Sequence, residues 1–461
     1  MKLRRLLLVA FCLAQTGLVP ALWGQATLTT VLTNGLTSRR INLVYLSEGY
    51  TSSQLPQFLN DVTNTMNKLL AIPPWSAYSN YFNVFAISVA SAQSGSDHYT
   101  PTTSLVNTYF NSCFDSFGIQ RLLTIPPNDH DGAYNDGEGK VAALLQQLLP
   151  DYDIAGLIVN DPTYGGSGGQ YLLLSLNSSS AEIANHEIGH TFARLGDEYS
   201  AAYPGYPDTE EPNTTTNATR SVKWHDWILP STPVPTPDVY SNYTVNGVFE
   251  GAHYHTTGWY RPKHDCKMRT LGVPYCEICA QELVLSMYRL IRPIQNFQPA
   301  STNLLSSTQD DVSFSLSILK PSTNSLIVQW FTNGIPVSEA TTTNFTINAF
   351  QLSVGTNEIK AIVHDPTAFV RADTNHVLWG TNIWKLAVIA APTITNPKLV
   401  GTTFTLSVPT QLGFKYVLEF KNLLDDANWT SIQTNNGNGG LISMTNSGLA
   451  GPGRFYRIRV Q

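Results

Sequence analysis

Residues 186–199 of this 461-residue chain read HEIGHTFARLGDEY, and the other assignments depend on this stretch. Residues four apart lie on one face of a helix, so His186 and His190 can direct two imidazole nitrogens at one metal ion. Glu187 stands beside them. Two imidazoles and a neighbouring carboxylate are the minimum set for zinc-assisted hydrolysis. The first expectation is therefore a metal-binding helix.

The residues around this stretch predict where the helix begins and ends. Ser179 and Glu182 have the spacing of a capping box, and Gly196 is the type of residue that commonly terminates a helix. The sequence thus predicts a helix from about Ala181 to Leu195.

A third protein ligand is needed, because a catalytic zinc site has three protein ligands and an open position whose water has a pKa of roughly 7. Asp197 is the preferred third ligand, since it is the first donor after the helix, and Glu198 is the second choice. Glu187 is the predicted general base, which takes a proton from the attacking water and passes it to the leaving amine. More distant alternatives for the third ligand are His253, His255 and His264.

The continuation Leu195-x-Asp197-Glu198-Tyr199 resembles the M64 metallopeptidase family, the IgA-peptidase type of zinc endopeptidase. The resemblance covers roughly residues 30 to 290, and it implies a zincin-like α/β catalytic domain, a Zn²⁺ cofactor and a protein or peptide substrate. The IgA specificity in the family's name need not transfer. Further similar stretches are 40–51 (RINLVYLSEGYT), 81–97, 258–262 (GWYRP), 266–269 (CKMR) and 275–279 (YCEIC).

Three residues of the later stretches have candidate roles at the site. Tyr260 is a candidate donor of a hydroxyl to the oxyanion of the tetrahedral intermediate, and Arg261 is the rival donor. Met268 is comparable with the methionine that forms a hydrophobic floor below the zinc in metzincins. An ordinary core methionine is the alternative.

The N-terminus predicts export. Residues 1–5 are basic, Leu6 to Ala14 is an apolar run too short to span a bilayer, and Gly24 and Ala26 suit a signal peptidase. We expect a signal peptide over residues 1–26 and a secreted location, either extracellular, periplasmic or at the cell surface. No later run reaches transmembrane length. A formal net charge of −6 with 13% charged residues does not favour nucleic acid as a partner.

Of the five cysteines, Cys12 lies in the predicted leader, which leaves Cys113, Cys266, Cys276 and Cys279. An even number of cysteines in an exported protein predicts disulfides, with three alternative connectivities. A Cys-x-x-Cys pair with two further cysteines also has the form of a structural zinc site. The oxidising compartment favours the disulfides.

The length predicts more than one domain. Residues 27–292 alternate apolar strand-like runs with helical stretches and predict the α/β catalytic domain. Within it, Tyr171 to Leu176 is the candidate edge strand to which a peptide substrate adds. Residues 300–390 resemble an Ig-like β-sandwich, and residues 395–461 resemble a small C-terminal β module of exported proteins. Contact with a cell surface or a polysaccharide is the partner interaction that these modules suggest.

Two functions from different classes follow from these features. The first is a secreted zinc-dependent endopeptidase with His186, His190 and Asp197 as ligands. The second is a catalytically inactive exported binding or adhesion protein that uses its β modules. The first is favoured, because a binding surface needs neither paired imidazoles nor a carboxylate base.

Overall fold

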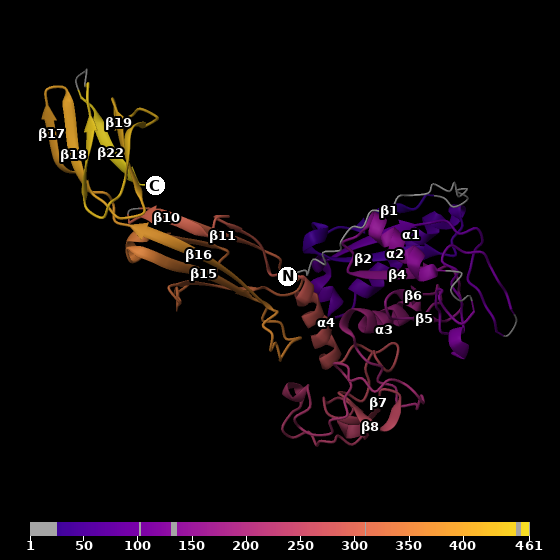
Figure 1. Ribbon diagram of the computed structural model, residues 1–461. Helices are drawn as coiled ribbons and strands as arrows, with labels where there is room; N and C mark the ends of the chain where they lie inside the picture. Colours follow the sequence, from indigo (N-terminus) through magenta and orange to yellow (C-terminus); the bar gives the residue numbers. More distant parts are fainter. Residues whose placement is uncertain (1–24, 101–102, 131–135, 309, 449–452, 461) are drawn as a thin grey trace. The chain divides into compact units, whose positions relative to one another are not determined.

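The computed structural model describes residues 25–100, 103–130, 136–308, 310–448 and 453–460. The signal peptide predicted for residues 1–26 thus lies almost wholly outside the described residues. The chain divides into two compact units. The first comprises the chain up to Pro293 together with Leu319–Leu326 and His364–Gly380. The second comprises the remaining segments, drawn mainly in orange and yellow (Figure 1).

A six-stranded sheet runs through the first unit in the order β1-β3-β2-β4-β6-β5. Strands β3, β2, β4 and β6 are parallel neighbours, and β1 and β5 are antiparallel to theirs. Parallel strands with both faces covered are largely apolar, as these are. The strands are β1 (Thr27–Leu32), β2 (Ile41–Glu48), β3 (Phe82–Ser88), β4 (Ile154–Val159), β5 (Gly166–Ser167) and β6 (Leu172–Leu174).

Helices cover both faces of this sheet (Figure 1). Alternate residues of a strand point to opposite faces. Leu43 and Tyr45 of β2 accordingly share a core with α1, α3 and α4, whereas Val44 and Leu46 share one with α2. The helices are α1 (Leu55–Leu70), α2 (Gly137–Leu148), α3 (Ser180–Ala193) and α4 (Glu277–Leu290). This arrangement is an α/β unit, and its assignment to a zincin-like fold stays a prediction.

The edge strand predicted at Tyr171 to Leu176 is not an edge. Its strand, β6, lies between β4 and β5, so both of its sides are hydrogen-bonded. The two-residue β5 takes the edge position because the Gly-rich loop of residues 164–169 (YGGSGG), which precedes β6, folds back on it. A short bridge from Leu122 to Gly166 occupies part of the outer side of β5 as well.

The second unit contains two β modules. In the first, a five-stranded sheet (β10-β16-β15-β12-β13) and a three-stranded sheet (β14-β11-β9) enclose an aromatic core. Trp330 of β12 and Trp384 of β16 stack with ring centroids 5.7 Å apart, and Phe314 of β11 packs on both. The strands are β9 (Ile294–Gln298), β10 (Asn303–Ser307), β11 (Asp311–Ile318), β12 (Ile327–Thr332), β13 (Ile335–Pro336), β14 (Asn344–Asn348), β15 (Gly355–His364) and β16 (Trp379–Ile389).

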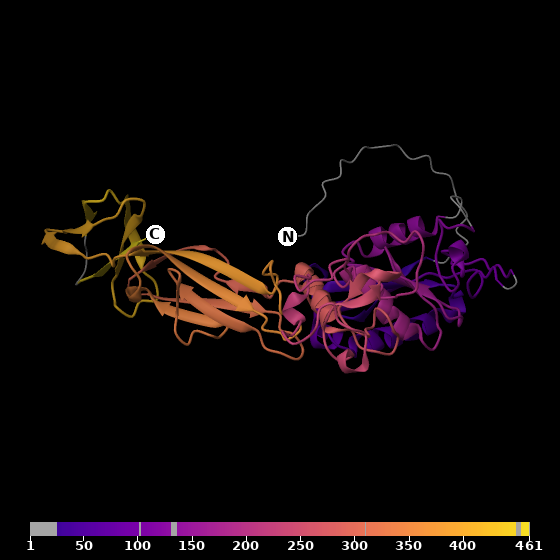
Figure 2. The ribbon, with the colours of Figure 1, turned by 90° about the horizontal axis from the view of Figure 1, so that it is seen from below.

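The second module consists of two three-stranded sheets, β17-β18-β21 and β20-β19-β22, drawn in yellow tones in Figure 2. Leu406, Val408 and Met444 of one sheet and Tyr416 and Leu418 of the other form its core. The expected β modules are therefore present. The strands are β17 (Thr395–Val400), β18 (Thr403–Pro409), β19 (Lys415–Lys421), β20 (Thr430–Asn436), β21 (Leu441–Asn446) and β22 (Phe455–Val460).

The predicted disulfides are absent from the described residues. None of the four cysteines outside the leader is in a disulfide. The sulfur of Cys113 lies 3.3 Å from Ser116 Oγ, whereas Cys266, Cys276 and Cys279 meet in a separate cluster. Two disulfides among these four cysteines would require Cys113 to lie beside one of the three clustered cysteines.

In the described part of the chain, helices fall short of the length and apolarity that a membrane span requires.

Candidate active site

The N-terminal end of α3 differs from the predicted capping box. Ser179 is the N-cap residue, but its side chain makes no capping hydrogen bond. Glu182 is engaged elsewhere, because its carboxylate accepts hydrogen bonds from Lys267 Nζ and from the backbone N–H of Gly272. A tertiary ion pair has replaced the local cap.

The C-terminal end comes earlier than Leu195. The helix ends at Ala193, and Arg194 adopts a left-handed φ of 54°. Gly196 has close neighbours instead: a Cβ atom at this position would lie 2.5 Å from Glu211 Oε2, so the Glu211 side chain would have to shift. The turn brings Asp197 back toward the helix.

Backbone carbonyls orient the two histidines of α3. His186 Nδ1 lies 2.9 Å from the carbonyl oxygen of Lys267, and His190 Nδ1 lies 2.5 Å from that of Leu195. A carbonyl oxygen only accepts, so we assign the proton to Nδ1 in both rings. Each Nε2 then presents a bare lone pair.

These two lone pairs and a carboxylate oxygen converge. The Nε2 atoms of His186 and His190 lie 3.1 Å apart, and Asp197 Oδ1 lies 3.0 Å from the first and 3.4 Å from the second. Three electron-pair donors at such distances repel one another unless a cation lies among them. The donor set therefore fits a metal ion with nitrogen and oxygen ligands.

The electrostatics of the site also favour a positive charge. Burial lowers the pKa of His190, but the hydrogen bond and charge of Asp197 outweigh this effect and raise the pKa to about 9. Burial raises the pKa of Asp197, but when no cation lies between them the imidazoles of His186 and His190 outweigh this effect through hydrogen bonding and charge, and they hold the pKa well below its ordinary value. The meeting point of the three side chains thus attracts a proton or a cation.

Glu187 lies beside this point, in a cleft of about 650 Å³. Burial raises the pKa of its carboxyl group, and the backbone N–H of Gly168 donates a hydrogen bond to the carboxylate. Gly168 packs closely here: a Cβ atom on it would lie 2.7 Å from Glu187 Oε2. The Gly-rich loop is therefore a wall of the cleft, and its backbone holds the predicted base. Other cleft-lining side chains include Arg121, Tyr164, Tyr199, Tyr206, Tyr254 and Leu271.

Met268 lies against α3 at Gly189, which stands between the two histidines in the sequence. It is fully buried, and a Cβ atom on Gly189 would lie 2.7 Å from its sulfur. Its carbonyl oxygen accepts a hydrogen bond from the backbone N–H of Glu198. The absence of a side chain at Gly189 lets the methionine pack against the helix that carries the histidines, and its role as a floor for the site stays a prediction.

The structure does not bring Tyr260 or Arg261 into the cleft. Tyr260, in β8 (His255–Arg261), bonds to the carboxylate of Glu250 on the opposite strand β7 (Phe249–Ala252). Arg261 is 1% exposed, and its guanidinium donates hydrogen bonds to two backbone carbonyls of β7 and to Asp238. Both side chains are committed to the hairpin and its surroundings.

Tyr254 contacts the candidate site, although the sequence did not single it out. It lies in the two-residue turn between β7 and β8, where His253 and Tyr254 have φ values of 54° and 56°. Positive φ at both positions is the geometry of a type I′ turn, which normally favours glycine or asparagine. The Tyr254 hydroxyl donates a 2.8 Å hydrogen bond to Asp197 Oδ2. It thereby leaves Oδ1 directed at the histidines.

The alternative third ligands point elsewhere. Glu198 is buried, and its carboxylate accepts a hydrogen bond from Asn213 Nδ2. His253 faces Glu211, His255 faces Asp208 and His264 faces Asp238. Among the five candidates for the third position, only Asp197 meets the two histidines of α3.

Comparisons with known proteins agree with this site. The sequence model of the IgA peptidase M64 family matches residues 30–246 and 238–287, which is more than half of the chain. No curated protein matches the chain. The match over the sheet, α3 and the cleft supports a peptidase function. The chain belongs to the IgA peptidase M64 family.

Similar solved structures include a cytokine receptor complex, at 14% identity over 36% of this chain and 88% of that one, with a TM-score of 0.20. The fibronectin(III)-like modules of CbhA from Clostridium thermocellum match at 12% identity over 36% and 83%, with a TM-score of 0.19. The titin domains z1z2 with telethonin match at 15% identity over 35% and 92%, with a TM-score of 0.17. Scores this low add nothing to the fold described above.

Proposed function

We propose that this protein is a secreted zinc-dependent endopeptidase in which His186, His190 and Asp197 bind Zn²⁺ and Glu187 is the general base. The convergence of two imidazole lone pairs with a carboxylate oxygen, beside Glu187 in a cleft, carries this proposal. Membership of the M64 family supports a protein or peptide substrate. The basic and apolar leader of residues 1–26 supports export.

Zn²⁺ bound here would supply a Lewis acid for the scissile carbonyl and the attacking water. Glu187 accepts the proton of that water and transfers it to the leaving amine. Burial raises the pKa of Glu187, which makes its carboxylate a stronger base. The Gly168 N–H fixes the direction of the carboxylate. Bare backbone at Gly169 leaves room for a peptide to approach, because nothing lies within 4 Å of a Cβ position on this residue.

The proposal is tested by measuring zinc content and peptide-library cleavage of the full chain. We expect cleavage that a chelator abolishes and added zinc restores. His190→Ala should lose one equivalent of zinc together with the activity. His225→Ala is the matched control, because His225 is exposed and pairs with Asp226. Absence of cleavage in zinc-loaded wild type would favour the binding or adhesion function and direct attention to the β modules.

A second expectation concerns the residue that orients Asp197. Tyr254→Phe removes the hydroxyl that bonds to Asp197 Oδ2. Loss of such an outer hydrogen bond costs roughly 10- to 100-fold in metal affinity. We expect zinc affinity to fall by about tenfold at the low end of this range, while kcat at saturating zinc changes much less. Tyr240→Phe is the control, because Tyr240 is 89% exposed. Equal zinc affinities of the two variants would remove this role from Tyr254.

A further inference from the structure

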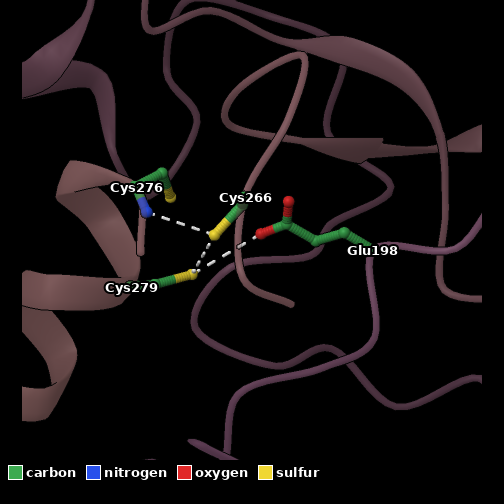
Figure 3. Close-up of side chains that lie close together, drawn as sticks. All are labelled: Glu198, Cys266, Cys276 and Cys279. Carbon is green, nitrogen blue, oxygen red and sulfur yellow. Dashed lines mark hydrogen bonds between the residues drawn. The ribbon is translucent and has the colours of Figure 1, made fainter. Parts of the chain in front are cut away.

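A second group of potential metal ligands lies behind the active site. Glu198, Cys266, Cys276 and Cys279 form a fully buried cluster, referred to below as the cysteine cluster. Figure 3 shows the sulfur atoms of Cys266 and Cys279 turned toward the carboxylate of Glu198. The residues come from three places: the segment after α3, the turn after β8 and the start of α4. No residue of the cysteine cluster belongs to the His186, His190 and Asp197 group.

The spacing of the donor atoms fits one small cation. One ligand atom from each residue lies within 4.8 Å of all the others. The sulfurs of Cys266 and Cys279 are 3.6 Å apart. Two thiolates on a tetrahedral zinc ion, with Zn–S bonds near 2.3 Å, lie about 3.8 Å apart. The observed separation is therefore close to that of a shared metal, and it exceeds the S–S bond of about 2.0 Å in a disulfide.

Hydrogen bonds within the protein do not satisfy every polar atom of the cysteine cluster. Glu198 is 0% exposed, and its Oε2 atom has no hydrogen-bond partner. A buried carboxylate oxygen without a partner is costly. Disulfide formation would not resolve the problem, because three cysteines leave one thiol over and the carboxylate unchanged. A divalent cation satisfies the sulfurs and the carboxylate together.

Burial raises the pKa of the Cys266 and Cys279 thiols when no cation is present, whereas the start of α4 and one backbone N–H favour negative charge on the sulfurs. Cys276 is the N-cap residue of α4 and Cys279 lies in its first turn, where the helix dipole favours negative charge. The backbone N–H of Cys276 donates a 3.2 Å hydrogen bond to Cys266 Sγ. The buried guanidinium of Arg261 acts electrostatically on Glu198, which gives this arginine a role outside the cleft.

We propose that Cys266, Cys276, Cys279 and Glu198 bind a second Zn²⁺ ion in a structural site. All four positions are protein ligands, as in closed structural zinc sites, so no position is left for a water. The site goes beyond the proposed peptidase function and does not depend on it.

The position of the cysteine cluster explains what the ion would stabilise. Glu198 directly follows Asp197, and Cys266 directly precedes Lys267, whose carbonyl orients His186. The next residue, Met268, packs under α3. A metal that joins Glu198 and Cys266 to α4 thus holds a ligand and an orienting group of the active site in place.

The test uses Co²⁺ as the probe on the full chain, after removal of bound metal. Thiolate ligands give Co²⁺ a sulfur-to-metal charge-transfer band, which a site of two histidines and an aspartate cannot produce. We expect this band in wild type and in His190→Ala, and its loss in Cys279→Ser. Cys113→Ser is the matched control, because Cys113 is a buried cysteine outside the cysteine cluster. Zinc content should fall by one equivalent in Cys279→Ser and stay unchanged in Cys113→Ser.

The His190→Ala variant, in which only the cysteine cluster keeps all its ligands, decides the question if Cys279→Ser fails to fold. A charge-transfer band that saturates at one equivalent of Co²⁺ in this variant, with all thiols alkylated after denaturation in chelator, supports the site. Absence of the band overturns it, as does a mass that shows a disulfide between Cys266 and Cys279. The His190→Ala result separates this outcome from the peptidase proposal, because that variant lacks only the active-site ligand.

Discussion

We expect Glu187→Gln to lower kcat for peptide hydrolysis by about 1,000-fold, within the range of roughly 10² to 10⁴ that a general base contributes. The glutamine side chain has nearly the same shape and still accepts a hydrogen bond from Gly168, but it cannot take a proton from water. Zinc content and KM should stay close to those of wild type, because Glu187 is not one of the three converging ligands. Steady-state kinetics and elemental analysis measure these quantities.

The matched control is Glu138→Gln, at an exposed glutamate in the first turn of α2. Its kcat should equal that of wild type. A Glu187→Gln variant with full zinc content and kcat within tenfold of wild type would exclude Glu187 as the base. Equal losses of zinc and activity would instead indicate that the substitution disturbs α3.

The convergence of His186 and His190 beside Glu187 could be predicted from the sequence because its geometry is local. A spacing of four places His186 and His190 on one face of any α-helix, and Glu187 follows from adjacency. Asp197 could be anticipated because few residues separate it from the helix. The capping box failed because Lys267, far away in the sequence, binds the carboxylate of Glu182. A local sequence pattern contains no sign that Lys267 competes with the helix cap for the Glu182 carboxylate.

The tyrosine near Asp197 could not be identified from spacing in the same way. Tyr254 and Tyr260 lie on one hairpin, and only the position of the turn decides which reaches the active site. His253 and Tyr254 are residue types that seldom occupy both positions of a type I′ turn. The sequence therefore carried no turn signal there. Their positive φ values became visible only in the structure.

The cysteines show a different limit of sequence analysis. An even number in an exported chain predicted pairs, yet the fold separates Cys113 from the other three. The fourth member of the cysteine cluster is a carboxylate, Glu198, which the sequence offered as an alternative active-site ligand. Asp197 and Glu198 are adjacent, but they face different sites. Which way each points is set by the tertiary environment, because Tyr254 binds the first and Asn213 the second.

Domain boundaries were expected near Arg292, but two later segments belong to the first unit. Leu319–Leu326 and His364–Gly380 pack with the α/β unit, although they connect strands of the first β module. Asp365 explains part of this packing. Its carboxylate is 1% exposed and accepts hydrogen bonds from the hydroxyls of Tyr78 and Tyr288 at 2.8 and 2.6 Å. Asn324 Nδ2 donates a third, at 2.5 Å.

Asp365→Ala should therefore destabilise the first unit, by about 4 kcal/mol, because removing one partner from a buried charged network leaves its donors unsatisfied. Tyr288 belongs to α4, so hydrogen exchange in α4 should accelerate strongly in the full chain, as mass spectrometry can measure. Asp226→Ala is the control, since an exposed ion pair contributes roughly 0 to 1 kcal/mol. Asp365→Asn keeps the shape of the side chain and one acceptor oxygen, so it should lose less stability than Asp365→Ala. If α4 exchanged equally slowly in Asp365→Ala and in wild type, the carboxylate would not be what holds the 364–380 segment to this helix.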